Sequence, residues 1–228
     1  MQGLELTRTS QYWSEVPGSA DPMNLMKAVF ESDNKYGIPT IKPQDFTPKD
    51  LVMYGQEVRR PKKDTWEKTI HFFLDDYKFE PLWNRPIKTL SMIQKIGSAL
   101  SPDFSLYLDY PRAIQIYNVY RNRWMGRYWQ ENGVDVIPTI AWSDEESYDY
   151  AFCGVEKHST VAVGTVGLKQ KGAKESFNKG FEEMIRVLEP KNLIVYGEIE
   201  PLDFSKYVDQ VHTYESYWAK RRGEINGR

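Results

Sequence analysis

The chain has 228 residues, of which 40% are hydrophobic and 27% are charged, and this composition excludes a disordered polypeptide. Its formal charge of −2 excludes a global basic field, so any binding to nucleic acid or to an anionic membrane has to be local. A single cysteine, Cys153, excludes an intrachain disulfide and a thiolate metal cage, and we interpret it as a small buried side chain of a cytosolic protein. No stretch resembles a signal peptide or a membrane span, so we expect no membrane partner.

The first 63 residues are expected to form an N-terminal arm and an irregular wrap around an α/β core at residues 64–228, the whole being one compact domain. Asp21-Pro22 predicts the start of a short helix over residues 23–31. Prolines punctuate the rest of the wrap, whose apolar patches predict short strands or irregular structure. The wrap ends on a basic loop, Arg59-Arg60-Pro61-Lys62-Lys63.

In the core, apolar runs of strand length alternate with stretches of helical periodicity. Strands are expected at residues 69–74, 99–104, 134–142, 160–166, 193–196 and 211–214, and helices at residues 79–84, 87–96, 111–131 and 174–188. Such alternation predicts the α/β class with a mostly parallel sheet. The sheet is either open and doubly wound or curled into a reduced or irregular (β/α) barrel, and we favour the barrel.

Acidic residues recur after the predicted strands, at the end of the sheet where the loops of an α/β fold converge on one crevice. They are Asp75, Asp103, Asp144 and Glu198. Converging carboxylates suit a divalent cation such as Mg²⁺ or Mn²⁺, or an acid/base pair, and these four are therefore the candidate catalytic residues. The alternative is that they cap the helices that follow.

The same crevice is the expected site for a phosphate-bearing ligand. Arg121 falls within the apolar stripe of the 111–131 helix, where a guanidinium needs an anionic partner, either a strand-end acid or the phosphate of a ligand. Segment 164–172 follows a strand and precedes a helix, so its backbone N–H groups are placed to cradle phosphate, although it matches no established phosphate-binding motif. The candidate ligand-binding residues are Arg121, Ser105, Trp142, Thr165 and Lys169.

A local basic stripe is predicted on the opposite face of the 111–131 helix. Arg112, Arg123 and Arg127 lie there, interleaved with tryptophan and tyrosine side chains, and this composition is used for binding single-stranded nucleic acid. A solvated helix face is the alternative. The three histidines show no metal-ligand spacing and no serine lies in a nucleophile elbow, which argues against a zinc site and against triad hydrolysis.

Several motifs between residues 71 and 196 occur together in one known family. They are Phe72-Phe-Leu-Asp-Asp-Tyr-Lys-Phe-Glu80, Ser101-Pro-Asp-Phe-Ser105, Gln115-Ile-Tyr-Asn-Val-Tyr-Arg-Asn-Arg123, Gly133-Val-Asp-Val-Ile-Pro-Thr139 with Trp142, Thr160-Val-Ala-Val163, and Pro190 to Gly197. The chain thereby resembles a domain-of-unknown-function family of phage and mobile-element proteins from mainly Gram-positive bacteria. The resemblance implies an accessory protein in the cytoplasm of a bacterial host, and it brings no established activity, catalytic residue or cofactor to this chain.

Three functions are compatible with these features. The first is a pocket protein or enzyme that binds or processes a phosphate-bearing ligand, a nucleotide or a nucleic acid, at the strand ends. The second is a nucleic-acid accessory protein that uses the arginine stripe and the basic loop. The third is a non-enzymatic protein that occupies a host factor, for instance in anti-defence, because tyrosine and tryptophan are abundant and anchor protein interfaces. We favour the first, because polar groups recur at successive strand ends.

Overall fold

A computed structural model of the chain describes residues 21–166, 168, 173–197, 204 and 210–226. Three of the expectations above fall outside these residues. They concern the N-terminal arm over the first twenty residues, the strand-end acid Glu198 and the phosphate-binding candidate Lys169.

The strands of the described residues pair in parallel and follow one another in chain order. They are β1 (Leu51–Met53), β2 (Thr69–His71), β3 (Ser98–Leu100), β4 (Asp135–Ile137), β5 (Thr160–Gly164), β6 (Asn192–Tyr196) and β7 (Gln210–Tyr214). A four-stranded sheet has the order β1-β2-β3-β4, and a three-stranded sheet has the order β5-β6-β7. An isolated parallel bridge between Thr139 and Ala162 connects the two. The α/β class is confirmed, and the sequential order agrees with the barrel, which stays a prediction.

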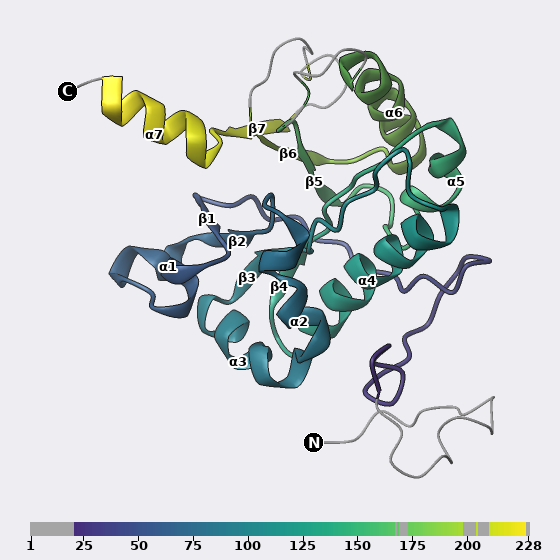
Figure 1. Ribbon diagram of the computed structural model, residues 1–228, viewed down its shortest axis with the longest axis horizontal. Coiled ribbons are helices and arrows are strands. Elements are labelled where there is room, and N and C mark those ends of the chain that lie inside the picture. Colours follow the sequence, from purple (N-terminus) through teal and green to yellow (C-terminus); the bar gives the residue numbers. More distant parts are fainter. Residues whose placement is uncertain (1–20, 167, 169–172, 198–203, 205–209, 227–228) are drawn as a thin grey trace.

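Helices connect the strands and cover the outside of the sheets (Figure 1). They are α1 (Gln56–Arg59), α2 (Glu80–Asn84), α3 (Pro86–Ile96), α4 (Arg112–Glu131), α5 (Tyr148–Ala151), α6 (Ala173–Leu188) and α7 (Tyr217–Asn226), with 3-10 turns at η1 (Lys63–Glu67), η2 (Asp76–Lys78) and η3 (Glu145–Ser147). Figure 1 shows α7 projecting from the body at the end of β7. No helix in the described part of the chain combines the length and apolarity needed to cross a membrane.

The helices predicted from periodicity form because their apolar residues recur on one face. In α6, Phe177, Phe181, Met184 and Leu188 are buried, at the spacing that places them on one side of the helix. α3 ends where Gly97 takes the left-handed conformation (φ 89°), which glycine adopts without steric penalty. The strand and helix positions predicted for the core are confirmed, with β2 to β5 shorter than their apolar runs and β6 and β7 one residue longer.

An apolar cluster joins the two sheets. It contains buried side chains from both, namely Leu51, Leu100, Ile137, Ala162, Ile194 and Tyr196. The Tyr214 hydroxyl of β7 donates a hydrogen bond to the Pro48 carbonyl, just before β1, so the last strand lies near the first. Among the described residues no ladder pairs β7 with β1. Among the described residues, the first and last strands are therefore connected by a side-chain contact and not by backbone pairing.

The wrap differs from its prediction in two respects. Residues 23–31 form turns where a helix was expected, because Asn24 has a left-handed backbone (φ 59°) that interrupts a helix, and its side chain donates to the Trp83 carbonyl at 2.9 Å. The wrap also contributes β1, which pairs with β2 at the edge of the sheet. The basic loop that follows β1 is consequently fixed beside this edge.

Candidate functional site

A cavity of about 850 Å³ lies along the edge of β1 and reaches α7. We call it the seam pocket, because it lies at the seam between the first and last strands. The carboxyl-terminal residues of three strands line it, namely Met53 of β1, His71 of β2 and Tyr196 of β6, together with Glu215 directly after β7. Asp50, Leu51 and Val52 at the start of β1 and Lys68 before β2 line it too, so the pocket runs along the edge of β1 as well as past the strand ends. Its residues are other than those predicted.

Positive charge lines the seam pocket without being neutralised. Arg60 and Lys62 of the basic loop and Arg221 of α7 line it, and none of the three forms an ion pair with an acid among the described residues, although the charge of Lys62 acts on Asp64. A guanidinium or ammonium group that lines a concave site without a counter-ion is placed to receive an anion.

The acids of the seam pocket are already engaged with two other cations. Lys68 lies 3.4 Å from Glu57 and 3.9 Å from Asp50, and it also pairs with Asp64 at 3.0 Å. These contacts raise the pKa of Lys68, first through the hydrogen bond with Asp64. Lys220 of α7 lies 3.5 Å from Asp50. Only Glu215 then opposes the three unpaired cations, so the pocket is electropositive.

Two aromatic side chains add neutral hydrogen-bond donors to the lining. Burial lowers the pKa of His71 to about 3, so the ring is uncharged at neutral pH. Its Nδ1 accepts from the Phe73 N–H at 3.4 Å, which assigns the ring proton to Nε2. The ring of Tyr196 lies 4.3 Å from that of His71, and its hydroxyl accepts from the Tyr217 N–H at 2.9 Å. The Tyr196 proton has no acceptor among the described residues, and burial raises the pKa of this phenol.

Helix α7 is held across the seam at its first turn. Ser216 caps the helix, with its hydroxyl accepting from the Ala219 N–H at 3.3 Å. The Tyr196 hydroxyl of β6 holds the Tyr217 N–H, and Lys220 reaches Asp50 beside β1. The cations of α7 are thus connected to both edges of the pocket.

The predicted catalytic carboxylates that the structure describes do not form one cluster. Asp75 is exposed and pairs with Lys78 at 2.7 Å. Asp144 pairs with Arg112 at 2.6 Å. Within the described ranges, no group of three or more His, Cys, Asp or Glu side chains is placed to hold a metal ion. The expected Mg²⁺ or Mn²⁺ site is therefore not assembled by Asp75, Asp103 and Asp144.

Asp103 and Ser105, which follow β3, both lie close to a further carboxylate, that of Asp76. Asp76, which follows β2, accepts from the Ser105 N–H at 3.0 Å and from its hydroxyl at 2.9 Å. Asp103 is half-buried and has no hydrogen-bond partner among the described residues. Burial, and then the charge of Asp76, raise the pKa of Asp103 to about 7. This pair is a local carboxyl couple outside the seam pocket.

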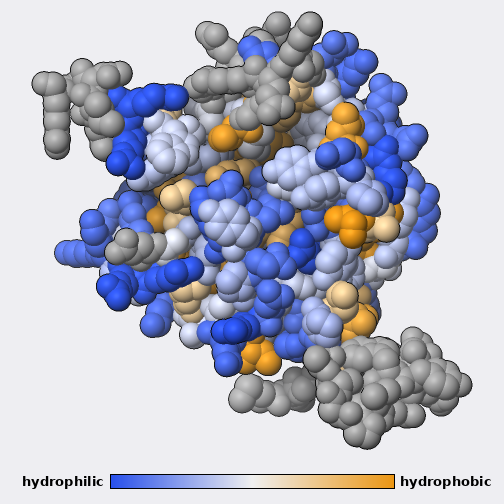
Figure 2. Space-filling model, viewed as in Figure 1, coloured by the Kyte–Doolittle hydropathy of each residue, from blue (hydrophilic) through white to orange (hydrophobic). Residues whose placement is uncertain are grey.

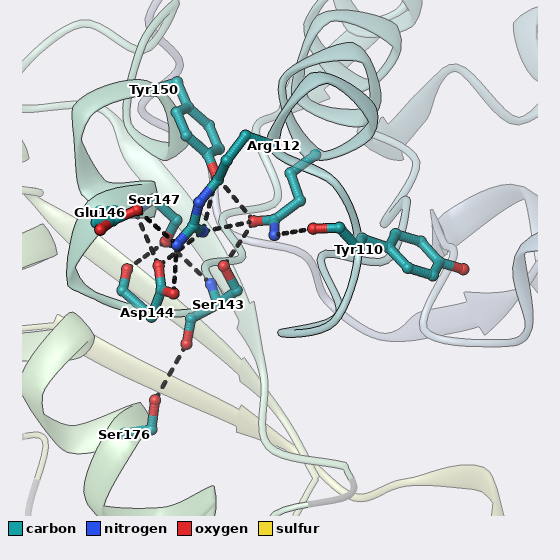
Figure 3. Close-up of polar contacts among 9 residues, drawn as sticks. Tyr110, Arg112, Ser143, Asp144, Glu146, Ser147, Tyr150 and Ser176 are labelled. Carbon is teal, nitrogen blue, oxygen red and sulfur yellow. Dashed lines mark hydrogen bonds and ion pairs between the residues drawn. The ribbon is translucent and has the colours of Figure 1, made fainter.

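Asp144 and Arg112 belong to a hydrogen-bonded network that locks the start of α4 to the segment after β4 (Figure 3). The guanidinium donates to both oxygens of Asp144, at 2.8 and 2.6 Å, and to Glu146 at 2.9 Å. Gln115, at the centre of the network, accepts from the hydroxyls of Ser143 and Tyr150 at 2.6 and 2.8 Å. The Arg112 hydrogen bond holds the pKa of Asp144 below its usual range. Asp144 also receives the Ser147 N–H and so caps η3.

Arg121, the predicted phosphate ligand, is already paired. Its guanidinium donates to both oxygens of Glu80, at the start of α2, at 2.8 and 2.9 Å, and to Asn118 at 2.6 Å. It also lies 3.9 Å above the ring of Phe104. Glu80 is thus its anionic partner, and it was not among the acids considered from the sequence.

The three arginines of the predicted stripe do not share a solvent-facing surface. Arg123 is 1% exposed, and its guanidinium donates to the carbonyls of Cys153, Thr139 and Ala151 at 2.9 to 3.0 Å. Burial lowers its pKa to about 10. Arg127 pairs with Glu131 at 2.8 Å. The expectation of a basic stripe is wrong because α4 is covered on the face that carries Arg123.

Two other predicted ligand-binding residues serve packing in this structure. The indole of Trp142 lies against α6, where a Cβ built on Gly180 would fall 2.1 Å from the indole nitrogen. Thr165 is buried after β5, and its hydroxyl donates to the Tyr196 carbonyl at 3.3 Å.

Sequence reasoning missed most of the seam pocket. The Lys220-Arg221-Arg222 run was visible in the sequence and signals a basic surface in the same way as the basic loop. His71 and Tyr196 carried no such signal, because they are far apart in the chain and meet only when β2 and β6 come together.

Comparison with known proteins places the chain among phage proteins. A family model described as a domain of unknown function (DUF4417) matches residues 30–215. A "Gene 1 protein" of Mycobacterium phage L5 is 40% identical over 217 residues, covering 95% of this chain and 94% of that protein. A "Gene 1 protein" of Mycobacterium phage D29 is 37% identical over 221 residues, covering 96% and 81%. No solved structure matches the chain.

Proposed function

This chain belongs to the family described as a domain of unknown function (DUF4417), and from that premise we propose that it binds a phosphate-bearing ligand, a nucleotide or a nucleic acid, in the seam pocket. The protein serves a phage or mobile element as an accessory protein in the cytoplasm of a bacterial host. The observation that carries the proposal is that Arg60, Lys62 and Arg221 line one cavity and form no ion pair with the described acids.

Charge decides between the seam pocket and a second cavity of about 470 Å³ beside η3. The second cavity is lined by four carboxylate residues and one lysine, namely Asp144, Glu145, Glu146, Glu175 and Lys179. A phosphate group would be repelled there. The seam pocket carries a net positive charge, because its acids Asp50 and Glu57 are already engaged by Lys68 and Lys220. Its volume lies in the range of ligand-binding pockets.

The seam pocket also has uncharged hydrogen-bond donors, so the proposed ligand carries neutral polar groups in addition to its phosphate. The Nε2–H group of His71 and the hydroxyl of Tyr196 donate hydrogen bonds without carrying charge, so they suit carbonyl, hydroxyl or ring-nitrogen acceptors. Guanidinium and ammonium groups suit the phosphate. Nucleotides combine both kinds of group in one molecule.

The test is isothermal titration calorimetry of the purified chain against inorganic phosphate and a panel of nucleoside mono-, di- and triphosphates. Removing one charged hydrogen-bond donor from a phosphate site costs about 1.5 to 3 kcal/mol, so Arg60→Gln and Arg221→Gln are each expected to weaken binding by roughly tenfold or more. Thermal unfolding gives a second readout, because a ligand at about 100 times its Kd adds roughly 2.7 kcal/mol.

Arg85→Gln is the matched control. Arg85 is an exposed arginine between α2 and α3, its guanidinium forms no ion pair with the described residues, and it lies outside the seam pocket lining. Its replacement removes one positive charge and is expected to leave binding unchanged. An equal loss in Arg85→Gln and Arg60→Gln would contradict the assignment of the site. If the wild-type chain bound neither phosphate nor any nucleotide of the panel, the proposed function would be contradicted and a host protein partner would be favoured.

A further inference from the structure

We propose that the ligand is single-stranded nucleic acid, with one nucleotide in the seam pocket and the neighbouring nucleotides on two basic rims that carry exposed tryptophans. The inference rests on the proposed function, because it takes the seam pocket as the phosphate site. It goes further by naming a polymer, and it predicts contacts outside the pocket that a free nucleotide would not make.

The first rim is the basic loop with the 3-10 turn that follows it. Arg59, Arg60, Lys62 and Lys63 are exposed at this edge of the pocket. Arg59 lies 5.6 Å above the ring of Tyr54, which orients it. Trp66, in η1, is 45% exposed, so an aromatic side chain is accessible at this rim.

The second rim is α7. Lys220, Arg221 and Arg222 are exposed along it, and Trp218 is 63% exposed. The ring of Tyr217, which lines the pocket, lies 5.3 Å from that of Trp218 in an edge-to-face arrangement. An aromatic path therefore leads from the pocket onto the helix. Figure 2 shows hydrophilic side chains over the first part of α7 and over the region of α1.

The combination of cations and exposed rings favours a single strand over other polyanions. Each rim pairs backbone-binding cations with a tryptophan face, and bases stack on such faces irrespective of sequence. In a duplex the base faces are stacked on one another, so Trp66 and Trp218 would gain little. An anionic membrane would need apolar side chains on one face of α7, yet this helix carries charged residues in the positions after Trp218.

The experiment measures fluorescence anisotropy of labelled oligothymidylates of about 4 to 16 nucleotides with the full chain. Affinity is expected to rise with length and to fall steeply with salt. Trp66→Ala and Trp218→Ala are each expected to weaken oligonucleotide binding by about tenfold, in line with the loss of one stacked base, and to leave mononucleotide binding unchanged. Tyr107→Ala is the matched control, because Tyr107 is 57% exposed and lies outside both rims.

Each other outcome overturns the inference in a distinct way. Mononucleotides could bind while affinity did not rise with oligonucleotide length and the tryptophan variants bound like the wild type. This result would rule out a polymer as the ligand and would leave the proposed function unaffected. Absence of both mononucleotide and oligonucleotide binding would contradict this inference and the proposed function together. Equal or tighter binding to the same oligonucleotide in a duplex would exclude single-strand stacking. Binding to phosphatidylserine vesicles in preference to oligonucleotides would replace the polymer by a membrane surface.

Discussion

At the scale of single residues, arginines of this chain serve three different purposes that the sequence alone does not separate. Arg121 is paired with Glu80, Arg123 is buried among carbonyl groups, and Arg60 lines the seam pocket without an acidic partner. The helical wheel of α4 correctly indicated that Arg121 needs an anion. It could not show that Arg123 turns inward, because the segment that covers it, residues 139–153, is distant in the chain.

Asp103 is the residue for which the structure predicts a pH dependence. Its pKa is raised to about 7 in the folded chain from an ordinary value of 3.8, so the folded state holds this proton more tightly than the unfolded state. The stabilisation is complete below about pH 4 and is lost as the pH rises through 7. Asp103→Asn mimics the protonated form. We expect it to exceed the wild type by about 1 to 2 kcal/mol at pH 8, since water screens part of the burial cost of a half-buried group.

Urea denaturation of both proteins between pH 4 and pH 8 measures this difference. A second variant, Asp76→Asn, removes the neighbouring charge that contributes to the raised pKa. In that background the gain from Asp103→Asn is expected to shrink. If the free energies of unfolding of the wild type and Asp103→Asn differed by the same amount at every pH, the raised pKa of Asp103 would be contradicted.

At the scale of elements, periodicity predicted the core because local pattern and burial agree there. The amphipathic stretches became α3, α4 and α6, and the apolar runs became β5 and β6 with nearly every residue buried. The pattern failed for residues 23–31, where a tertiary hydrogen bond of Asn24 fixes a left-handed backbone. The pattern did not predict α7, which has no apolar face and is held by contacts with Asp50, just before β1, and with Tyr196 of β6.

The contact between α6 and Trp142 provides a stability test at this scale. A Cβ on Gly180 would lie 2.1 Å from the indole nitrogen, and the indole is held at 5.1 Å from the ring of Phe177. Gly180→Ala gains up to about 1 kcal/mol of helix propensity but overpacks a rigid ring, which costs about 1 to 3 kcal/mol. We expect a net destabilisation of about 1 to 2 kcal/mol in urea denaturation.

Lys179→Ala is the control on the same helix, because Lys179 is exposed and its ion pairs are long, at 3.8 and 3.9 Å. It is expected to stay within about 0.5 kcal/mol of the wild type. A Gly180→Ala variant as stable as Lys179→Ala would show that Trp142 has room to move.

At the scale of the whole molecule, the position of the site follows from the strand order. Strands that are parallel and sequential bring their carboxyl ends to one edge, which is why the sequence predicts a site there, whereas the seam pocket also runs along β1 from Asp50. Its composition was not, because the pocket forms where β1 and β7, the two ends of the sheet order, approach one another. Residues 60, 71, 196 and 221 belong to four separate segments, and no spacing rule relates them. Of the described acids singled out from the sequence, Asp75 after β2 and Asp144 after β4 are ion-paired, and Asp103 after β3 is half-buried near Asp76.

The measurement that tests the central claim most directly is photoaffinity labelling of the wild-type chain with an 8-azidoadenosine nucleotide, followed by mapping of the labelled peptides by mass spectrometry. The account predicts label in peptides that contain residues 50–71 or 217–222, lost on addition of excess unmodified nucleotide. Label confined to residues 101–123 or 142–148, around Asp103, Arg121 and Asp144, would contradict it and return the site to the strand ends first singled out from the sequence.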